Sequence, residues 1–178
     1  MSQISKNLYK KLQKQYSRRI NLDLKRIKKV LQKLNNPQNQ VDNVINIIGS
    51  DGKNSVLTSL KYFLEANKEK VNAFTSPHLY DVRQRFWLGD RFITINEIKK
   101  YKKLIEKTKV KLTLFELITF VYVLGLISKK MFCPTILPSL LVPVFSCFSL
   151  KTAFLKTHVE QKVAFAYDLG LLLEETLF

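Results

Sequence analysis

A lysine and a serine lie in a short glycine-rich turn that follows an apolar segment. The sequence from Val44 to Ser55 reads VINIIGSDGKNS. The apolar run predicts a buried parallel strand at 44–48, and the residues after the turn predict a helix at 55–67. A helix N-terminus after such a turn can bind phosphate, because its first N–H groups have no partners within the helix. In this interpretation Lys53 supplies the counter-charge, and the Ser55 hydroxyl can meet a metal ion.

The spacing of this turn leaves two interpretations open. The pattern is G-x-x-G-K-x-S, which is shorter than the general nucleotide-binding loop and has one residue between the lysine and the serine. The same residues suit a solvated turn between a strand and a helix, with Lys53 as one more surface lysine in a lysine-rich chain. Spacing alone does not decide between phosphate binding and a plain turn.

Four segments, taken in chain order, resemble the folylpolyglutamate synthase and dihydrofolate synthase family, which is related to the Mur ligases. GSDGKNS at 49–55 is similar to the family's G-T-N-G-K-G-S loop. FTSPHL at 74–79, followed by Arg85, is similar to its T-S-P-H-L segment and the F-N-E-R-I that comes next. Residues 20–38 resemble the helix and N-P element before its first strand, and LTLFEL at 112–117 resembles its F-F-E helix start. The order of the four segments makes the resemblance specific.

The resemblance implies an ATP-dependent ligase of folate biosynthesis, which joins glutamate to a dihydropteroate or folate carboxylate through an acyl phosphate. ATP and Mg²⁺ are the implied cofactors, because an anionic carboxylate attacks an anionic phosphate and the charge must be neutralised. The implied metal ligands are Ser76 and Ser55. The implied ATP-binding residues are Gly49, Ser50, Asp51, Gly52, Lys53, Asn54 and Ser55. The implied residues of the dihydropteroate or folate site are Leu22, Asp23, Leu24, Ser76, Pro77, His78, Arg85, Thr113, Phe115 and Glu116.

The chain departs from the family pattern at several of these positions. Asp51 stands where the family has asparagine, and its carboxylate should repel a polyphosphate unless a metal ion intervenes. Asn54 replaces a glycine, which we expect to be mild because asparagine tolerates a positive φ. Asp81 and Gln84 stand where the family often has arginine and glutamate, so altered substrate contacts are expected. The pattern indicates a divergent member of the family.

The expected fold class is α/β, with a partial P-loop-type parallel sheet, flanking helices, an N-terminal helical cap and an irregular apolar C-terminal tail. Residues 44–48 and 70–74 are the expected parallel strands, and RFWLGDRF is an expected strand pair that turns at Gly89 and Asp90. The predicted helices cover residues 3–16, 22–34, 55–67, 95–107 and 113–128.

The composition changes near residue 130. Residues 1–130 contain 27 of the 30 lysines and arginines and 10 of the 14 acids, whereas residues 131–178 contain three bases and four acids. Residues 131–150 have no charge, and their prolines Pro134, Pro138 and Pro143 disfavour both a central strand and an unbroken helix. The sheet is therefore expected to end near residue 130 with an exposed edge.

Three segments follow from this change, namely a helical segment at 1–40, a partial Mur ligase-like ATP-binding domain at 41–130 and an atypical tail at 131–178. The family's ligases are about twice this length or more and carry a second α/β domain, which 178 residues do not accommodate. The hypothesis is that the chain is an N-terminal ligase fragment with an out-of-frame tail and negligible turnover on its own.

Other function classes are weaker alternatives. A net charge of +16 suggests nucleic-acid binding, but a lysine excess of 24 to 6 over arginine also arises from AT-rich coding. Residues 131–150 are long enough to span a bilayer, but their prolines argue against it. A basic binding fragment and a small membrane-associated protein nevertheless remain as alternatives.

The start of the chain has no apolar signal core, so a cytoplasmic monomer is expected. Cys133, Cys147, His78 and His158 do not form a zinc pattern.

Overall fold

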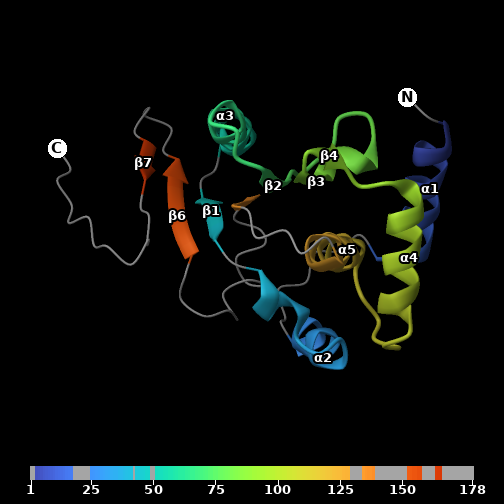
Figure 1. Cartoon of the computed structure of the whole chain (residues 1–178). Helices are drawn as coiled ribbons and strands as arrows, with labels where there is room; N and C mark the ends of the chain where they lie inside the picture. The colour runs from blue at the N-terminus through green and yellow to red at the C-terminus, as the bar shows by residue number, and fades with distance from the viewer. Residues whose placement is uncertain are drawn as a thin grey trace.

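The structure is a computed structural model that describes residues 3–17, 25–41, 43–48, 51–128, 134–138, 152–157 and 163–165. It confirms the predicted α/β class: a mixed sheet lies between α3 on one face and α5 on the other (Figure 1). The helices are α1 (Gln3–Gln15), α2 (Lys25–Lys33), α3 (Lys53–Ala66), α4 (Ile95–Glu106) and α5 (Leu114–Ser128), with short 3₁₀ turns η1 (Pro37–Gln40) and η2 (Val82–Arg85). The strands are β1 (Val44–Ile48), β2 (Val71–Phe74), β3 (Phe86–Gly89), β4 (Arg91–Phe92), β5 (Thr135–Pro138), β6 (Thr152–Thr157) and β7 (Val163–Phe165).

The sheet has the order β4-β3-β2-β5-β1-β6-β7. β5 is parallel to both of its neighbours, with Ile136 opposite Ala73 of β2 and Ile45 of β1. Along β1 the side chains alternate: Ile45 and Ile47 join the cluster under α3, while Val44 joins the core around α5. The chain therefore crosses from β1 through α3 to β2 and leaves a gap between these two strands that β5 fills.

The prediction that the prolines exclude a central strand is wrong for β5. Pro134 lies just before the strand, where its carbonyl accepts a hydrogen bond from Asn72 N, and Pro138 is the last strand residue. Only Thr135, Ile136 and Leu137 lie between them, and each of these has an N–H to donate. All three are fully buried, so the sheet continues past residue 130 instead of ending there. Pro143 lies outside the described residues.

The predicted helices are present, with boundaries that differ by at most three residues. α3 begins at Lys53, two residues earlier than expected, which brings Lys53, Asn54 and Ser55 into its first turn. The predicted strand pair is β3 and β4, joined through Gly89 and Asp90. β2, β3 and β4 form an antiparallel extension at one edge of the sheet.

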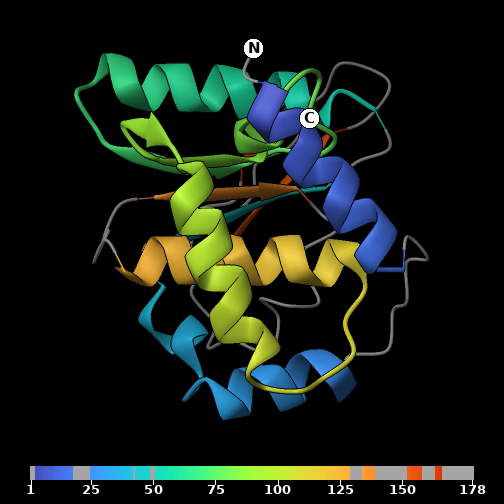
Figure 2. The ribbon, with the colours of Figure 1, turned by 90° about the vertical axis from the view of Figure 1, so that its right-hand side faces the viewer.

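The N-terminal helices share one hydrophobic core with α5. Leu12 of α1 and Ile27, Val30 and Leu31 of α2 are buried in the same cluster as Tyr122. Both views place α2 beneath α5, on the side away from the sheet, whereas α1 lies at the side of the molecule next to α4 (Figures 1 and 2). Within the described part of the chain, no helix combines the length and apolar character needed to cross a membrane.

Candidate functional site

The candidate residues gather at the carboxyl edge of the parallel strands. β1 ends at Ile48 and is followed by the glycine-rich turn, while β2 ends at Phe74 and is followed by the 75–81 loop. Because parallel strands end at the same edge of a sheet, both loops open on one side, and α1 crosses that side of the molecule (Figure 2). This edge, where the strand order reverses around β1, is where open α/β sheets bind ligands.

The first turn of α3 carries several of the residues predicted to bind phosphate, which we call the phosphate loop (residues 49–55). Gly52 is the N-cap residue with φ of 71°, and Val56 N donates to its carbonyl at 3.0 Å. No atom lies within 4 Å of a Cβ built at Gly52, so this position requires glycine for its left-handed backbone and not for space. The N–H groups of Lys53 and Asn54 begin the helix and point out of its N-terminus. Gly49 and Ser50 lie outside the described residues.

Asn54 is helical and has no positive φ, so our explanation for its replacement of glycine is wrong. The change is tolerated because the left-handed conformation falls on Gly52, two residues earlier. The Asn54 side chain instead reaches the second motif, where its Nδ2 donates to Ser76 O at 3.5 Å. Although 22 residues separate them, Asn54 and Ser76 bring the two predicted motifs into contact.

Arg85 organises the loop that contains Ser76 and His78. Its Nη1 donates to Ser76 Oγ at 3.0 Å, and its Nε donates to His78 Nδ1 at 2.8 Å. Burial lowers the pKa of Arg85, and the opposing influence of Tyr9 is smaller. Burial, and then the charge of Arg85, also lower the pKa of His78, against the attraction of Asp81. Because Nδ1 accepts a hydrogen bond, the neutral imidazole carries its proton on Nε2.

Asp81 and Gln84 have a structural role that the sequence analysis missed. They form a capping box at the start of η2, in which Gln84 Oε1 accepts hydrogen bonds from the backbone N–H groups of Leu79, Tyr80 and Asp81. Asp81 also accepts from Ser5 of α1 and from Arg83. Burial would raise the pKa of Asp81, but these hydrogen bonds outweigh it and hold the pKa far below its usual value. An aspartate followed three residues later by a glutamine was the available signal.

Thr113 and Glu116 also cap a helix, although the resemblance implied a substrate role. Thr113 N donates to Glu116 Oε2 at 2.6 Å, and Glu116 N donates to Thr113 Oγ1 at 3.3 Å, which closes the first turn of α5. Glu116 is 3 % exposed and pairs with Arg26 at 2.9 Å. The start of α5 lies against the end of α1, where Leu114 N donates to Ser17 O.

The remaining implied substrate residues are only partly placed. Phe115 is half-buried beside the core, and Pro77 follows Ser76 through a cis peptide bond. Leu22, Asp23 and Leu24 lie outside the described residues, as do His158, Cys133 and Cys147. The structure therefore brings the phosphate loop and the Ser76–Arg85 loop together. Glu116 instead forms an ion pair with Arg26 and caps its own helix.

The residues present fit a magnesium ion that is bound mainly by phosphate oxygens. In the part of the chain that the structure describes, no cluster of three or more histidine, cysteine or acidic residues could hold a metal ion alone. Mg²⁺ in nucleotide sites usually takes one or two protein ligands and completes its shell with phosphate and water. Ser76 Oγ accepts one hydrogen bond from the described residues, donated by Arg85, and so keeps a lone pair for such an ion.

The fold is that of the folylpolyglutamate synthase and dihydrofolate synthase structures. E. coli FolC in complex with DHPP and ADP has a TM-score of 0.64 and 22% identity, covering 75% of this chain and 32% of that one. The folylpolyglutamate synthase of Thermotoga maritima has a TM-score of 0.63 and 24% identity, covering 76% and 32%. The Yersinia pestis bifunctional enzyme, complexed with AMPPNP and Mn ion, has a TM-score of 0.64 and 24% identity, covering 75% and 32%.

The sequence comparison points to the same family. The chain is 35% identical to the dihydrofolate synthetase of Saccharomyces cerevisiae (strain ATCC 204508 / S288c) over 104 residues, which are 56% of this chain and 24% of the yeast protein. No family model matches the chain. These findings confirm the resemblance that the sequence motifs predicted. The chain spans about a quarter of the length of the yeast protein, and about a third of the length of the three solved structures.

Proposed function

We propose that this chain is the N-terminal part of an ATP-dependent ligase that adds glutamate to dihydropteroate or folate. The observation that carries the proposal is the contact between Asn54 and Ser76, because it joins the phosphate loop to the loop that would hold the metal ion. The sequence similarity to yeast dihydrofolate synthetase supports the same reaction class. Relatives whose structures hold ADP, or AMPPNP and Mn, support a nucleotide and a divalent ion as ligands.

In the proposed reaction a substrate carboxylate attacks the γ-phosphorus of ATP, ADP leaves, and the glutamate amine then displaces phosphate from the acyl phosphate. The N–H groups at the start of α3 would bind phosphate oxygens, and Lys53 would neutralise their charge. Ser76 would hold Mg²⁺, which supplies further charge neutralisation for the transferring group. Arg85 fixes the orientation of the Ser76 hydroxyl through the hydrogen bond to its oxygen.

The test is the nucleotide response of the Lys53→Ala variant. The chain should melt at a higher temperature with Mg²⁺ and AMPPNP, because a ligand that binds only the folded state stabilises it. Lys53→Ala should lose most of this rise. Lys99→Ala on α4 is the matched control, since it removes the same charge at an exposed position of another helix. An equal rise in both variants, or binding that salt abolishes and DNA competes away, would support the alternative of a basic binding fragment.

The tail hypothesis belongs to the same proposal. If residues from another reading frame follow the ligase sequence, the junction lies after β5, because Thr135, Ile136 and Leu137 are fully buried between β1 and β2. Sequencing the gene and transcript across codons 125 to 178 tests this. A glutamate-bearing glycine-rich segment in another frame after codon 138 would support a full-length ligase, whereas its absence in all three frames would contradict the junction.

A further inference from the structure

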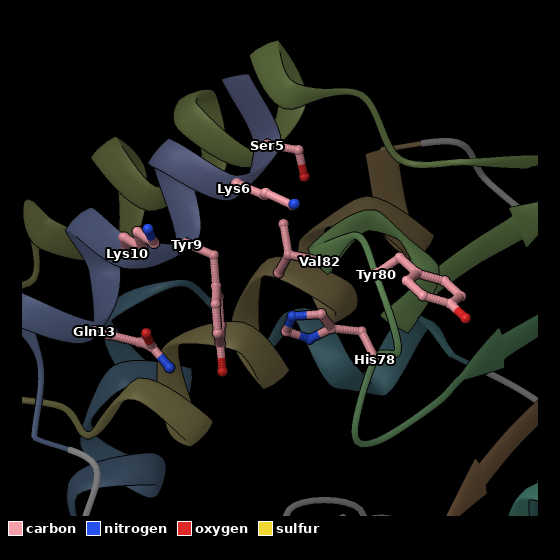
Figure 3. A pocket seen from close by; sticks show the side chains of 8 residues that line it. All are labelled: Ser5, Lys6, Tyr9, Lys10, Gln13, His78, Tyr80 and Val82. Atoms are coloured by element: carbon pink, nitrogen blue, oxygen red, sulfur yellow. The ribbon is translucent and has the colours of Figure 1, made fainter. Parts of the chain in front are cut away.

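A cleft of about 180 Å³ lies between α1 and the 78–82 loop. Figure 3 shows Lys6, Tyr9, Lys10 and Gln13 along one wall, which belongs to α1, and His78, Tyr80 and Val82 along the other. The cleft lies beside the candidate ATP site but is lined by different residues, because neither the α3 turn nor Ser76 contributes to it. Of its lining residues, the resemblance assigns only His78 to the folate site, so the proposed function gives the α1 wall of the cleft no ligand.

The polar groups of the cleft are mostly hydrogen-bond donors. Lys6 and Lys10 are one turn apart on α1, so their ammonium groups can reach a common ligand. Gln13 adds an amide, and Tyr9 adds a hydroxyl. His78 offers an Nε2–H, because its Nδ1 accepts from Arg85.

No carboxylate lines the cleft among the residues that the structure describes. Asp81 follows the lining residue Tyr80 in the chain, and its oxygens already accept hydrogen bonds from Ser5 and Arg83. Ser5, which is fully buried, is committed to that contact. Among the described residues that line the cleft, none therefore neutralises Lys6 or Lys10.

The shape of the cleft limits the size of its ligand. Tyr9 and His78 pack edge to face with ring centroids 4.5 Å apart, and this pair forms a rigid apolar side. A volume of about 180 Å³ is below the usual range of about 300 to 1,000 Å³ for pockets that bind larger organic ligands. A nucleotide or an intact folate is too large, whereas a short dicarboxylate or a phosphate ion fits.

We propose that this cleft is a second binding site, which takes a small oxyanion between Lys6 and Lys10 of α1 and the His78 edge of the facing loop. Carboxylate and phosphate share the required chemistry, namely two or more oxygens that accept hydrogen bonds from ammonium and N–H donors. An anion there would join α1 to the loop that carries Ser76 and His78. Occupancy would then stabilise the loop without any contact with the phosphate loop.

The experiment measures the binding of glutarate and of inorganic phosphate to the whole chain by calorimetry at low salt. The variant Lys6→Gln/Lys10→Gln should weaken glutarate binding about tenfold, because two partly exposed charge contacts are lost. Lys99→Gln/Lys103→Gln is the matched control: it removes two lysines with the same spacing from α4, where they line an open hollow without a histidine or tyrosine. This control should bind glutarate as the unmodified chain does.

Lys53→Ala separates this proposal from the proposed function. Loss of phosphate binding in Lys53→Ala alone would assign that ion to the α3 turn, while glutarate binding that persists would still support the cleft. The proposal is overturned if glutarate fails to bind, if the two double variants weaken its binding equally, or if Lys53→Ala abolishes it. Binding of glutarate without phosphate would identify a carboxylate ligand, and equal binding of both would identify a general oxyanion site.

Discussion

The guanidinium group of Arg85 donates one hydrogen bond to Ser76 and one to His78. Replacing Arg85 by methionine keeps much of the apolar volume and removes both. The pKa of His78 should rise toward its ordinary value, since burial would remain but the nearby positive charge would not. The free energy of unfolding should fall by about 1 to 2 kcal/mol, because the half-buried Ser76 and His78 lose hydrogen bonds from a charged donor. NMR titration of His78 and urea unfolding measure the two effects.

Arg91→Met is the control for this experiment. Arg91 pairs with Glu97 in the β4–α4 region, so its loss removes one positive charge from the chain without touching the Ser76 loop. The pKa of His78 should stay unchanged in this variant. An equal rise of that pKa in both variants would mean that net charge, and not the Arg85 contact, sets it.

At the level of single residues, the sequence indicated the local structure around Gly52 better than that around Glu116. A turn at Gly52 followed by a helix was expected from the glycine-rich segment after a buried strand, although α3 begins at Lys53, two residues before the predicted start. Thr113 and Glu116 match the family motif equally well, yet they cap α5 and Glu116 pairs with Arg26. A pairing between residues 90 positions apart depends on tertiary packing, which local patterns do not contain.

Glu116, which is itself buried, both caps α5 and forms an ion pair with the partly exposed Arg26. Glu116→Ala should lower the free energy of unfolding by about 3 kcal/mol, since it leaves the charge of Arg26 without its partner and removes a cap. Glu65→Ala is the control, because Glu65 pairs with Lys61 in a partly exposed i,i+4 contact on α3 that should contribute about 0.5 kcal/mol or less. Urea unfolding compares the two. Similar losses would show that the Arg26 pair adds little.

The Glu97 carboxylate at the start of α4 should make the free energy of unfolding depend on pH in the acidic range. Hydrogen bonds from Arg91 lower the pKa of Glu97 to about 2; burial opposes this shift, and hydrogen bonds from Thr94 add to it. The unfolded chain has the ordinary value near 4.5. A carboxyl group with a depressed folded pKa stabilises the protein above its unfolded pKa and loses this contribution as the pH falls through the folded value. The stabilisation that Glu97 contributes should therefore be lost as the pH falls from 4.5 to about 2.

Glu97→Gln tests this dependence. The variant should be less stable than the unmodified protein at pH 6, and the difference should shrink between pH 4.5 and 2, as measured by thermal unfolding. Arg91→Met should shrink the same acid dependence, because it removes the main donors to Glu97. A difference from Glu97→Gln that is constant across this pH range would contradict the assignment.

The helices were easier to predict than the strands beyond residue 130. α4 has its apolar residues Ile98, Tyr101 and Ile105 at helical spacing and starts with the T-x-x-E capping box, so its sequence alone defines it. β5 has three residues between two prolines, and its strand conformation comes from pairing with β1 and β2. β6 and β7 were not predicted, because β6 pairs with β1, which lies far earlier in the chain, and β7 adds to the sheet by pairing with β6, while strand propensity is weak by comparison.

On the scale of the whole molecule, β5 links the two halves of the sheet. β1 and β2 do not pair with each other, and each of them forms its parallel ladder with β5. Ile136 of β5 is fully buried and packs with Ile47 of β1, Ala73 of β2 and Leu57 of α3. The position of the phosphate loop relative to the Ser76 loop is therefore set by residues that follow the change in composition near residue 130.

A chain that ends at residue 130 should consequently fail to unfold cooperatively, because the ladders on both sides of β5 would be lost and the cluster under α3 would be exposed. Ile136→Ala tests the same dependence without truncation, and it should lower the free energy of unfolding by about 3 kcal/mol through the cavity it creates. Leu104→Ala, at a position 38% exposed on α4, should cost about 0.5 kcal/mol or less. If residues 1–130 show a sharp urea transition and Ile136→Ala has no more effect than Leu104→Ala, then β5 does not hold the sheet together. The larger loss at Ile136 would instead mean that the segment through Pro138 is a native part of the fold, whatever the origin of the residues after it.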